Sequence, residues 1–290
     1  MRVLQLNIWA RGGPYRTRAG MLRREIGVMA PDVMALQECD GTDDDDNQAV
    51  ELFGPLGYQV RFEPRPGKNR GDPGIAIVAR HPIGELQVKD LGHDGVAIAA
   101  QVSIGVRRLW FCSAVPLGWW PNQEGQREDE CVVLDEWLTG LARDDELPPI
   151  LAGDFDATPD ASSIRFLTGL QSLQGRSTHW VDTFAVAGDG SPGTTWSSNN
   201  PYVAPFAAAT FAEPSHHRRI DYVFVGSPFK WKPRIVVRSA AVVLLERGDA
   251  APSDHYGVVA DLDLDGVLIG DGEGPEGWAS AERVLWPEDG

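Results

Sequence analysis

Leu151–Asp160 reads LAGDFDATPD, and this stretch decides the fold. The apolar run Pro149–Ala152 predicts a short buried strand, and two carboxylates, Asp154 and Asp156, follow it. Residues i and i+2 of an extended segment lie on the same face, so the two carboxylates can converge on one ion. Taken alone, the stretch is better explained as an Asp-rich turn than as part of a cation site. The residues beside the other predicted strands distinguish the two interpretations.

Four more stretches place a polar side chain where an apolar strand begins or ends. They are LQLNIW (4–9) with Asn7, LQE (36–38) with Glu38, RRIDYVFV (218–225) with Asp221, and SDHYGV (253–258) with Asp254 and His255. Each has an ordinary explanation, such as a buried Asn bonded to the backbone or a histidine at the surface. Their order along the chain, each beside a predicted strand, indicates one common site.

The residue types of this set favour a hard divalent cation. Mg²⁺ binds through one or two carboxylates and keeps several waters for a substrate phosphate. His255 stands next to Asp254, and Asp221 supplies a further carboxylate that could fix the tautomer of the imidazole. The pattern therefore predicts phosphate-ester chemistry on a metal.

The spacing of apolar residues predicts an α/β fold in which strands outnumber helices. Strands are expected at Val3–Trp9, Val33–Gln37, Gly57–Phe62, Gly74–Ala79, Val96–Ile104, Arg108–Ala114, Pro149–Ala152, Ile220–Val225, Ile235–Leu245 and Val258–Leu264. Helices are expected at Arg18–Met29, Arg127–Leu141 and Ser162–Leu170. Because strands and helices do not alternate strictly, a two-sheet sandwich with helices outside is expected.

Length and composition predict a globular protein of one large domain or two small ones, and the chain is expected to be cytoplasmic. Residues 1–264 of the 290 carry the strand pattern, and 265–290 form an acidic, Gly-rich C-terminal extension. No apolar run approaches the ~20 residues that span a bilayer, and a strand pattern begins almost at Met1, without a secretory leader. Cys39, Cys112 and Cys131 match no zinc spacing, so buried free thiols are expected.

The net charge of −16 bears on the substrate. Nucleic-acid binding requires Lys and Arg along the phosphate track, and the 26 basic residues of this chain form no basic block. Tight or processive binding of nucleic acid is therefore disfavoured, although a local basic groove on an acidic protein stays open. The run Asp43–Asp46 is interpreted as a solvated acidic loop.

The joint order of these stretches, together with GIAIVARHPI (74–83) and GTTWSSNNP (193–201), resembles the endonuclease/exonuclease/phosphatase superfamily. The resemblance spans residues 1–264. It implies a four-layer α/β/β/α sandwich with two mostly antiparallel sheets, and a site at one end of the sheets that uses Mg²⁺ or Mn²⁺.

The same resemblance implies a role for each matched residue. Glu38 corresponds to the main metal ligand, with Asn7 beside it and Asp254 on the far side. Asp154 corresponds to the residue that positions or deprotonates the attacking water. His255, oriented by Asp221, corresponds to the histidine that contacts or protonates the phosphate. Asp156 stands where the family more often has Asn.

One departure from the family pattern concerns the turn after the strand Arg108–Ala114. A histidine that binds phosphate is usual there, and this chain has Pro116, which has no side-chain donor. Arg70 or His93 could replace it, although each also fits a plain loop residue. Trp119 and His217 are further candidates for substrate contacts, with rim packing and a flexible basic loop as the alternatives.

The sequence thus supports a metal-dependent phosphoesterase that cleaves a phosphomonoester or phosphodiester, with a small-molecule or headgroup substrate favoured. A metal-dependent nuclease is the first alternative. A non-catalytic binding relative, which has lost turnover with Pro116, is the alternative from a different class. A monomer without a membrane span is expected in each case.

Overall fold

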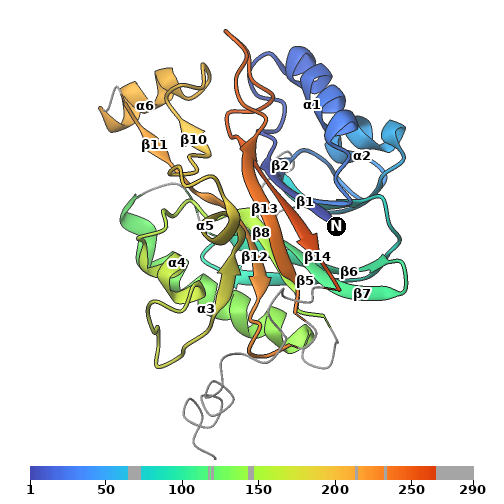
Figure 1. Ribbon diagram of the computed structural model, residues 1–290. Helices are drawn as coiled ribbons and strands as arrows, with labels where there is room; N and C mark the ends of the chain where they lie inside the picture. Colours follow the sequence, from blue (N-terminus) through green and yellow to red (C-terminus); the bar gives the residue numbers. More distant parts are fainter. Residues whose placement is uncertain are drawn as a thin grey trace, which may run out of the picture.

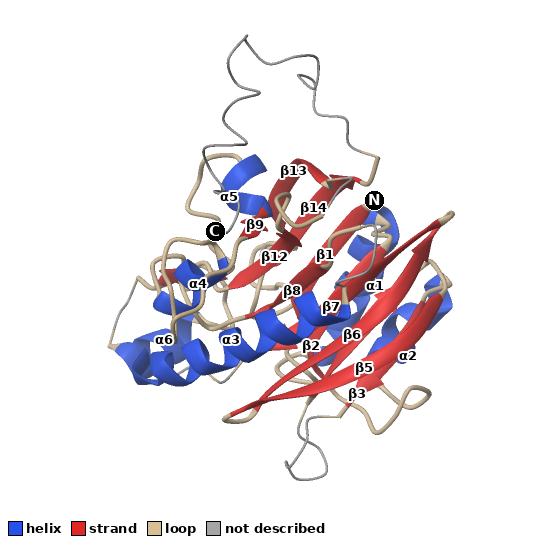
Figure 2. Ribbon diagram, turned by 90° about the horizontal axis from the view of Figure 1, so that it is seen from below, coloured by secondary structure: helices blue, strands red, loops and turns tan. Residues whose placement is uncertain are grey.

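Two six-stranded sheets lie face to face, and strands from each contribute to the same end of the molecule (Figures 1 and 2). The computed structural model describes residues 1–64, 73–116, 118, 121–142, 147–212, 215–231 and 234–265. The predicted C-terminal extension therefore lies outside the described residues, apart from Asp265. Among the described helices, none combines the length and the apolar character that crossing a membrane requires.

The first sheet has the strand order β13-β14-β1-β2-β4-β3. Its strands are β1 (Arg2–Asn7), β2 (Val33–Cys39), β3 (Gln59–Glu63), β4 (Gly74–Ala79), β13 (Val236–Val243) and β14 (Gly257–Asp263). Only the β1–β2 pair is parallel.

The second sheet has the order β5-β6-β7-β8-β12-β9. Its strands are β5 (Ile83–Gly92), β6 (Gly95–Ile104), β7 (Arg107–Val115), β8 (Ile150–Asp154), β9 (Trp180–Asp182) and β12 (Asp221–Gly226). Here only the β7–β8 pair is parallel. The prediction of two mostly antiparallel sheets is confirmed.

Helices cover the outer face of each sheet and complete the four layers. In Figure 1, α1 (Tyr15–Met29) and α2 (Gln48–Phe53) lie on one side of the strands, and α3 (Glu124–Leu141) and α4 (Ser162–Leu167) lie on the other. Leu22 and Ile26, one turn apart on α1, are fully buried against the first sheet. Burying side chains of this size stabilises the fold by ~1.5–3 kcal/mol each.

Several elements, all but one of them short, were absent from the prediction. They are α2, β5, β9, α5 (Thr183–Ala187), β10 (Trp196–Ser197), α6 (Ala204–Phe211) and β11 (His217–Arg218). β5 is an edge strand in which Leu91 is the one buried residue and glycine and charged residues interrupt the apolar positions, so its apolar signal is weak. α6 is short and rich in alanine after Pro205. Nearly all of its residues are apolar, so its sequence shows no contrast between a polar and an apolar face. The helix α1 also begins earlier than expected, at Tyr15 and not at Arg18.

The core between the two sheets is apolar over most of its length. Alternate residues of the facing strands fill it, among them Val3 of β1, Ile150 and Ala152 of β8, and Val223 and Val225 of β12. The intervening residues of the same strands pack outward against the helices. The position of every side chain on these strands therefore follows from its place in the alternation.

Candidate active site

The inward face of the sheets changes from apolar to polar at one end. On β1, Gln5 and Asn7 continue the row that Val3 begins, and all three are buried. On β8 and β12 the same alternation places Asp154 and Asp221 toward the space between the sheets, where both are buried. Strand periodicity thus carries carboxylates and amides into the end of an otherwise apolar core.

Two carboxylate residues of the site adopt a left-handed backbone that non-glycine residues seldom adopt. Glu38 has φ +50° and lies in a bulge of β2, where the pairing with β4 shifts between Leu36 and Cys39. Asp156 also has φ +50°. A bulge re-aims the side chain it carries, and such strain clusters at functional sites. The bulge explains why Glu38 points to the site although β2 alternates regularly before it.

Asn7 connects carboxylates from the two sheets. Its amide Nδ2 donates to Asp154 Oδ2 at 2.9 Å and to Glu38 Oε1 at 3.2 Å. Its Oδ1 accepts the backbone N–H of Trp9 at 2.9 Å. The amide nitrogen therefore faces the carboxylates, and a metal contact from Asn7 would use the remaining lone pair of Oδ1.

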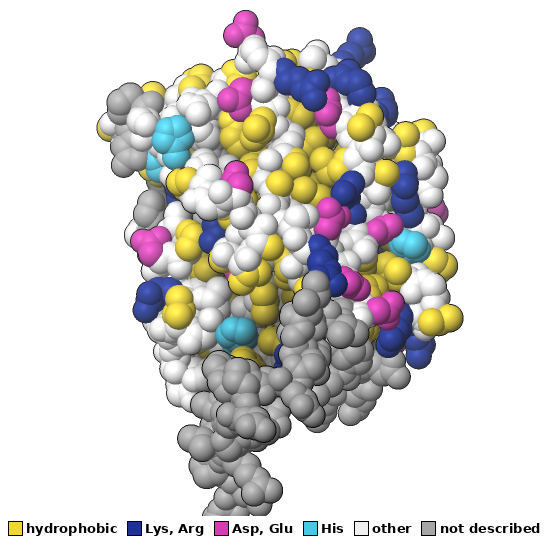
Figure 3. All heavy atoms as spheres, viewed as in Figure 1, with side chains coloured by type: hydrophobic (Ala, Val, Ile, Leu, Met, Phe, Trp, Pro, Cys, Tyr) yellow, Lys and Arg dark blue, Asp and Glu magenta, His cyan; other side chains and the backbone are white. Residues whose placement is uncertain are grey.

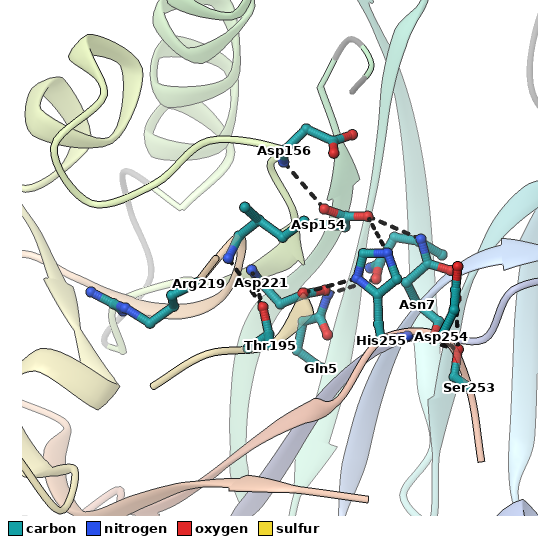
Figure 4. A network of polar contacts seen from close by, with 12 residues as sticks. Gln5, Asn7, Asp154, Asp156, Thr195, Arg219, Asp221, Ser253, Asp254 and His255 are labelled. Carbon is teal, nitrogen blue, oxygen red and sulfur yellow. Dashed lines mark hydrogen bonds and ion pairs between the residues drawn. The ribbon is translucent and has the colours of Figure 1, made fainter. Parts of the chain in front are cut away.

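His255 lies between two buried carboxylates, as Figure 4 shows. Its Nδ1 is 3.0 Å from Asp221 Oδ2, and its Nε2 is 3.8 Å from Asp154 Oδ2. Burial alone would lower the pKa of His255, but the charges of Asp221 and Asp154 outweigh it and raise this pKa well above its usual range. The contact with Asp221 Oδ2 favours the form of the imidazole that carries its hydrogen on Nδ1.

Asp221 is itself fixed on all sides. Gln5 Nε2 donates to Asp221 Oδ1 at 2.8 Å, and the same nitrogen lies 2.8 Å from Gln37 Oε1. Thr195 Oγ1 accepts the backbone N–H of Asp221 at 3.2 Å. Because one carboxylate oxygen bonds Gln5 and the other bonds His255, Asp221 is held in a single orientation.

The loop that carries Asp254 and His255 is anchored to the first sheet. Ser253 Oγ donates to the carbonyl of Asn7 at 2.7 Å, and Asn200 Nδ2 donates to the carbonyls of Ser253 at 2.8 Å and Asp254 at 3.1 Å. Both Ser253 and Asn200 are fully buried. The two functional side chains thus stand on a backbone that has little freedom to move.

The carboxylates of the site raise one another's pKa values. Burial raises the pKa of Glu38, and the charge of Asp254 adds to this effect. Burial and the charges of Asp156 and Asp221 raise the pKa of Asp154 well above its usual range. Negative charge concentrated in this way on oxygen ligands is the arrangement that a hard divalent cation neutralises, so these residues fit a metal.

Two groups of side chains could hold that metal. Ligand atoms of Asp154, Asp221 and His255 all lie within 4.8 Å of one another. Both oxygens of Asp221 are already hydrogen-bonded, however, so this trio is better described as a hydrogen-bonded network. Glu38 and Asp254 form the second group: both line the cavity, and the charge of Asp254 raises the pKa of Glu38.

The site opens into a cavity of about 290 Å³. Its charged lining is made of the carboxylates, His255 and Arg218, and the rest is largely aromatic. The lining residues are Trp9, Glu38, Asp154, Asp156, Trp196, Tyr202, Val203, Phe206, Phe211, Arg218, Ile220, Asp254 and His255. Substrate-sized cavities in proteins begin at about this volume.

The structure brings together the candidates expected for metal binding and catalysis, but not all of those expected for substrate binding. Asn7, Glu38, Asp154, Asp156, Asp221, Asp254 and His255 meet at the same end of the sheets. His217 is exposed and hydrogen-bonded to Ser197 and Ser215, whereas Arg218 lines the cavity. The reason is that adjacent strand residues point to opposite faces, so β11 can direct only one of the two inward.

The other candidates lie elsewhere. Arg70 and Trp119 are outside the described residues. His93 is on the surface, with Nε2 3.4 Å from Asp129 Oδ2, and it does not line the cavity. Pro116 directly follows β7, whose Ala114 pairs with Gly153 next to Asp154, so the turn without the histidine adjoins the site.

Sequence reasoning missed Gln5, Thr195, Asn200 and the aromatic residues of α6. Thr195 and Asn200 belong to the stretch GTTWSSNNP, whose match to the family was the available signal. Gln5 shares a strand face with Asn7, which alternation alone could have indicated.

Comparison with known proteins identifies the family. Residues 4–255 match the sequence profile of the Endonuclease/Exonuclease/phosphatase family. The chain belongs to this family. It is therefore a phosphoesterase of a metal-dependent superfamily, and the fold and enzyme class expected from the sequence are confirmed.

Solved structures share the fold at low sequence identity. The human Nocturnin catalytic domain with bound sulfate is 23% identical, with a TM-score of 0.67 over 91% of this chain and 93% of that one. D. rerio TDP2 complexed with a single-strand DNA product is 18% identical, with a TM-score of 0.69 over 91% and 98%. The mannosyl-6-phosphatase Bt3783 of Bacteroides thetaiotaomicron is 18% identical, with a TM-score of 0.65 over 91% and 99%. Curated protein sequences give no match.

Proposed function

We propose that this protein is a Mg²⁺- or Mn²⁺-dependent hydrolase of a phosphomonoester or phosphodiester of a small molecule or headgroup. One observation carries the proposal: Glu38, Asp154 and Asp254 line a single cavity with His255, whose Nδ1 lies 3.0 Å from Asp221 Oδ2. This combination supplies oxygen ligands for a cation and a donor for phosphate.

In this proposal Glu38 and Asp254 hold the metal, with Asn7 beside them. When bound, the metal offsets negative charge on the oxygens of the reacting phosphate. Asp156 adds a further negative charge to the same cavity, and the proposal assigns it to strengthening the hold on the cation.

Asp154 is positioned to orient the attacking water and accept its proton. Its pKa is raised from the ordinary carboxylate value, and a base works best when its pKa approaches the working pH. Asn7 donates to Asp154 Oδ2 and fixes the carboxylate in place.

His255 acts as the donor to phosphate. Asp221 holds Nδ1–H, and this leaves Nε2–H to hydrogen-bond a phosphate oxygen or the leaving group. The protonated imidazole supplies positive charge where the phosphate lies, which partly offsets the absence of a histidine at Pro116.

Charge favours a small substrate over polymeric nucleic acid. Arg218 is the single Arg or Lys among the described residues that line the cavity. On the face seen in Figure 3, one group of Lys and Arg gathers near the top, and further down Lys and Arg are interspersed with Asp and Glu. The net charge of −16 also disfavours a nucleic-acid substrate and favours a small phosphate ester. We further expect the protein to be a monomer and cytoplasmic.

The test is an assay of the purified protein against a chromogenic monoester, a chromogenic diester and plasmid DNA. We expect Mg²⁺ or Mn²⁺ to support turnover of an ester, EDTA to abolish it, and His255→Ala to lower it by ~10²-fold or more. His93→Ala is the matched control because that histidine is exposed. Absence of turnover with either metal would favour the binding relative, and preferred cleavage of the plasmid would favour the nuclease.

A further inference from the structure

Five aromatic side chains share the cavity with the carboxylates. Trp196, Tyr202, Phe206 and Phe211 come from the β10–α6–β11 excursion, which begins at Trp196 and ends at Arg218, and Trp9 comes from the loop after β1. In Figure 1 this excursion stands beside the open end of the sheets. The cavity therefore joins two unlike surfaces, one made of carboxylates and the other of rings.

The rings hold one another in place. Trp196 lies edge-on to Phe206 at 6.0 Å and to Phe211 at 6.2 Å between ring centroids, and Phe206 lies edge-on to Phe211 at 6.0 Å. Trp9 and Tyr202 are 5.1 Å apart. Arrangements of this kind are favourable in themselves, so the aromatic surface exists before a ligand arrives.

Trp9 is fixed from behind by a buried arginine. The guanidinium of Arg18 lies 4.7 Å from the Trp9 ring, and its nitrogens donate to the carbonyls of Ile8 at 2.9 Å and Trp9 at 3.0 Å. Arg18 is fully buried and does not line the cavity. The positive charge of Arg18 therefore stabilises Trp9 and the backbone beside it, and it does not contact a substrate anion in the cavity.

The aromatic side of the cavity offers few polar partners. Among the described lining residues outside the carboxylate cluster and His255, Arg218 is the single charged one, and its Nη2 donates to the carbonyl of Asp156 at 2.7 Å. A second phosphate group bound on this side of the cavity would have one cationic partner, Arg218. Sugar hydroxyls bound there would lose hydrogen bonds to water, and the aromatic side chains would not replace them fully. An apolar ring bound there loses no hydrogen bonds to water, and it gains contacts with the aromatic side chains.

We propose that this aromatic surface is a subsite for a planar aromatic group of the substrate, placed next to the phosphate that the carboxylate side receives. The inference rests on the proposed function, and it narrows the substrate to phosphate esters whose alcohol carries an aromatic ring. Phe206, which is 39% exposed on α6, and Trp196 are the residues that set this preference.

The test compares three esters that all release a primary alcohol: benzyl phosphate, cyclohexylmethyl phosphate and glucose 6-phosphate. Each is also assayed as its methyl diester, so that a monoesterase and a diesterase are both covered. We expect kcat/KM for the benzyl ester to exceed that for the glucose ester by ~10-fold or more, because only the benzyl group gains ring contacts with the aromatic side chains. The cyclohexylmethyl ester should fall between them.

Variants of one side chain separate the ring from its apolar surface. Phe206→Ala should lower the benzyl-to-glucose ratio of kcat/KM by ~3–10-fold, and Phe206→Tyr should retain most of it. Phe206→Leu should lower the benzyl-to-cyclohexylmethyl ratio because it keeps apolar area but removes the ring. Phe229→Ala is the matched control, since Phe229 is 68% exposed and does not line the cavity.

The outcomes are distinguishable. A glucose ester hydrolysed as well as the benzyl ester, or a ratio unchanged by Phe206→Ala, would overturn the subsite while leaving the proposed function intact. Loss of turnover on every ester would instead overturn the proposed function. In that case the aromatic subsite can still be tested by binding. Tryptophan fluorescence measures the Kd values of benzylphosphonate and methylphosphonate. The subsite requires the benzyl compound to bind ~10-fold more tightly.

Discussion

At the scale of single residues, the state of His255 depends on partners that lie on other strands. Asp221 bonds its Nδ1, and Asp221 is in turn bonded by Gln5 from the opposite sheet. Asp154 faces the other ring nitrogen. The histidine is thus one member of a chain of hydrogen bonds, and each member can be tested by a conservative substitution.

Removing the charge of Asp221 should disable His255 without unfolding the protein. In Asp221→Asn the imidazole loses the carboxylate that holds Nδ1–H, so we expect kcat to fall by ~10²-fold or more while KM changes little. Steady-state kinetics on the active ester measure both constants. The control is Asp129→Asn, an exposed carboxylate. A variant with wild-type kcat would show that Asp221 does not act on His255 in catalysis.

Gln5 should act through Asp221, as a positioning residue. Gln5→Met preserves the size of the side chain but removes the donor to Asp221 Oδ1, so we expect kcat to fall by ~3–10-fold with KM unchanged. A merely structural role would lower the melting temperature and leave kcat of the folded protein intact. Calorimetry alongside kinetics separates the two results.

At the scale of elements, the strand ends that carry the site follow from the sequence, whereas the elements that shape the substrate pocket do not. Asn7, Asp154 and Asp221 follow from alternation on strongly apolar strands, which local sequence encodes. The bulge that aims Glu38 depends on its pairing with β4, a contact distant in sequence. Likewise β10, β11 and α6 are too short to show a period, so Phe206 and Arg218 could not be placed beforehand.

The close contact of β7 and β8 explains a glycine of the stretch LAGDFDATPD. A Cβ on Gly153 would collide with the carbonyl oxygen of Ala114 on the neighbouring strand. We expect Gly153→Ala to destabilise the protein by about 1–3 kcal/mol, because the backbone of β8 has to shift.

Thermal unfolding of Gly153→Ala and Gly140→Ala measures this effect against a matched control. Gly140 lies in α3 with open space where its Cβ would stand, so the same substitution should stabilise that helix by up to about 1 kcal/mol. Equal melting temperatures for the two variants would contradict the close approach of β7 and β8.

At the scale of the whole molecule, the site exists only where the two sheets meet. Asn7, Glu38 and His255 belong to the first sheet or its loops, and Asp154 and Asp221 belong to the second. The bonds Gln5–Asp221, Asn7–Asp154 and His255–Asp221 all cross between the sheets. Activity therefore requires the assembled sandwich, and neither half holds the site alone.

The same assembly buries the three free cysteines, as the sequence predicted. Burial raises the pKa of Cys39 to about 12, and it also raises the pKa values of Cys112 and Cys131. A thiol reacts as its thiolate, so at pH about 8 the folded protein should react with a thiol reagent ~10²-fold more slowly than the unfolded protein. Titration with and without denaturant measures this ratio, and rapid reaction of the folded protein would contradict the packing.

The central claim, that Glu38 and its neighbouring carboxylates hold a catalytic metal, is tested most directly by ester hydrolysis across a Mn²⁺ titration. For the wild type we expect no turnover in EDTA and saturation as Mn²⁺ is added. For Glu38→Gln, which keeps the shape but removes the charge, the Mn²⁺ concentration at half-maximal rate should rise by ~10–100-fold. Turnover that persists in EDTA, or a Glu38→Gln curve that coincides with the wild type, would contradict the account.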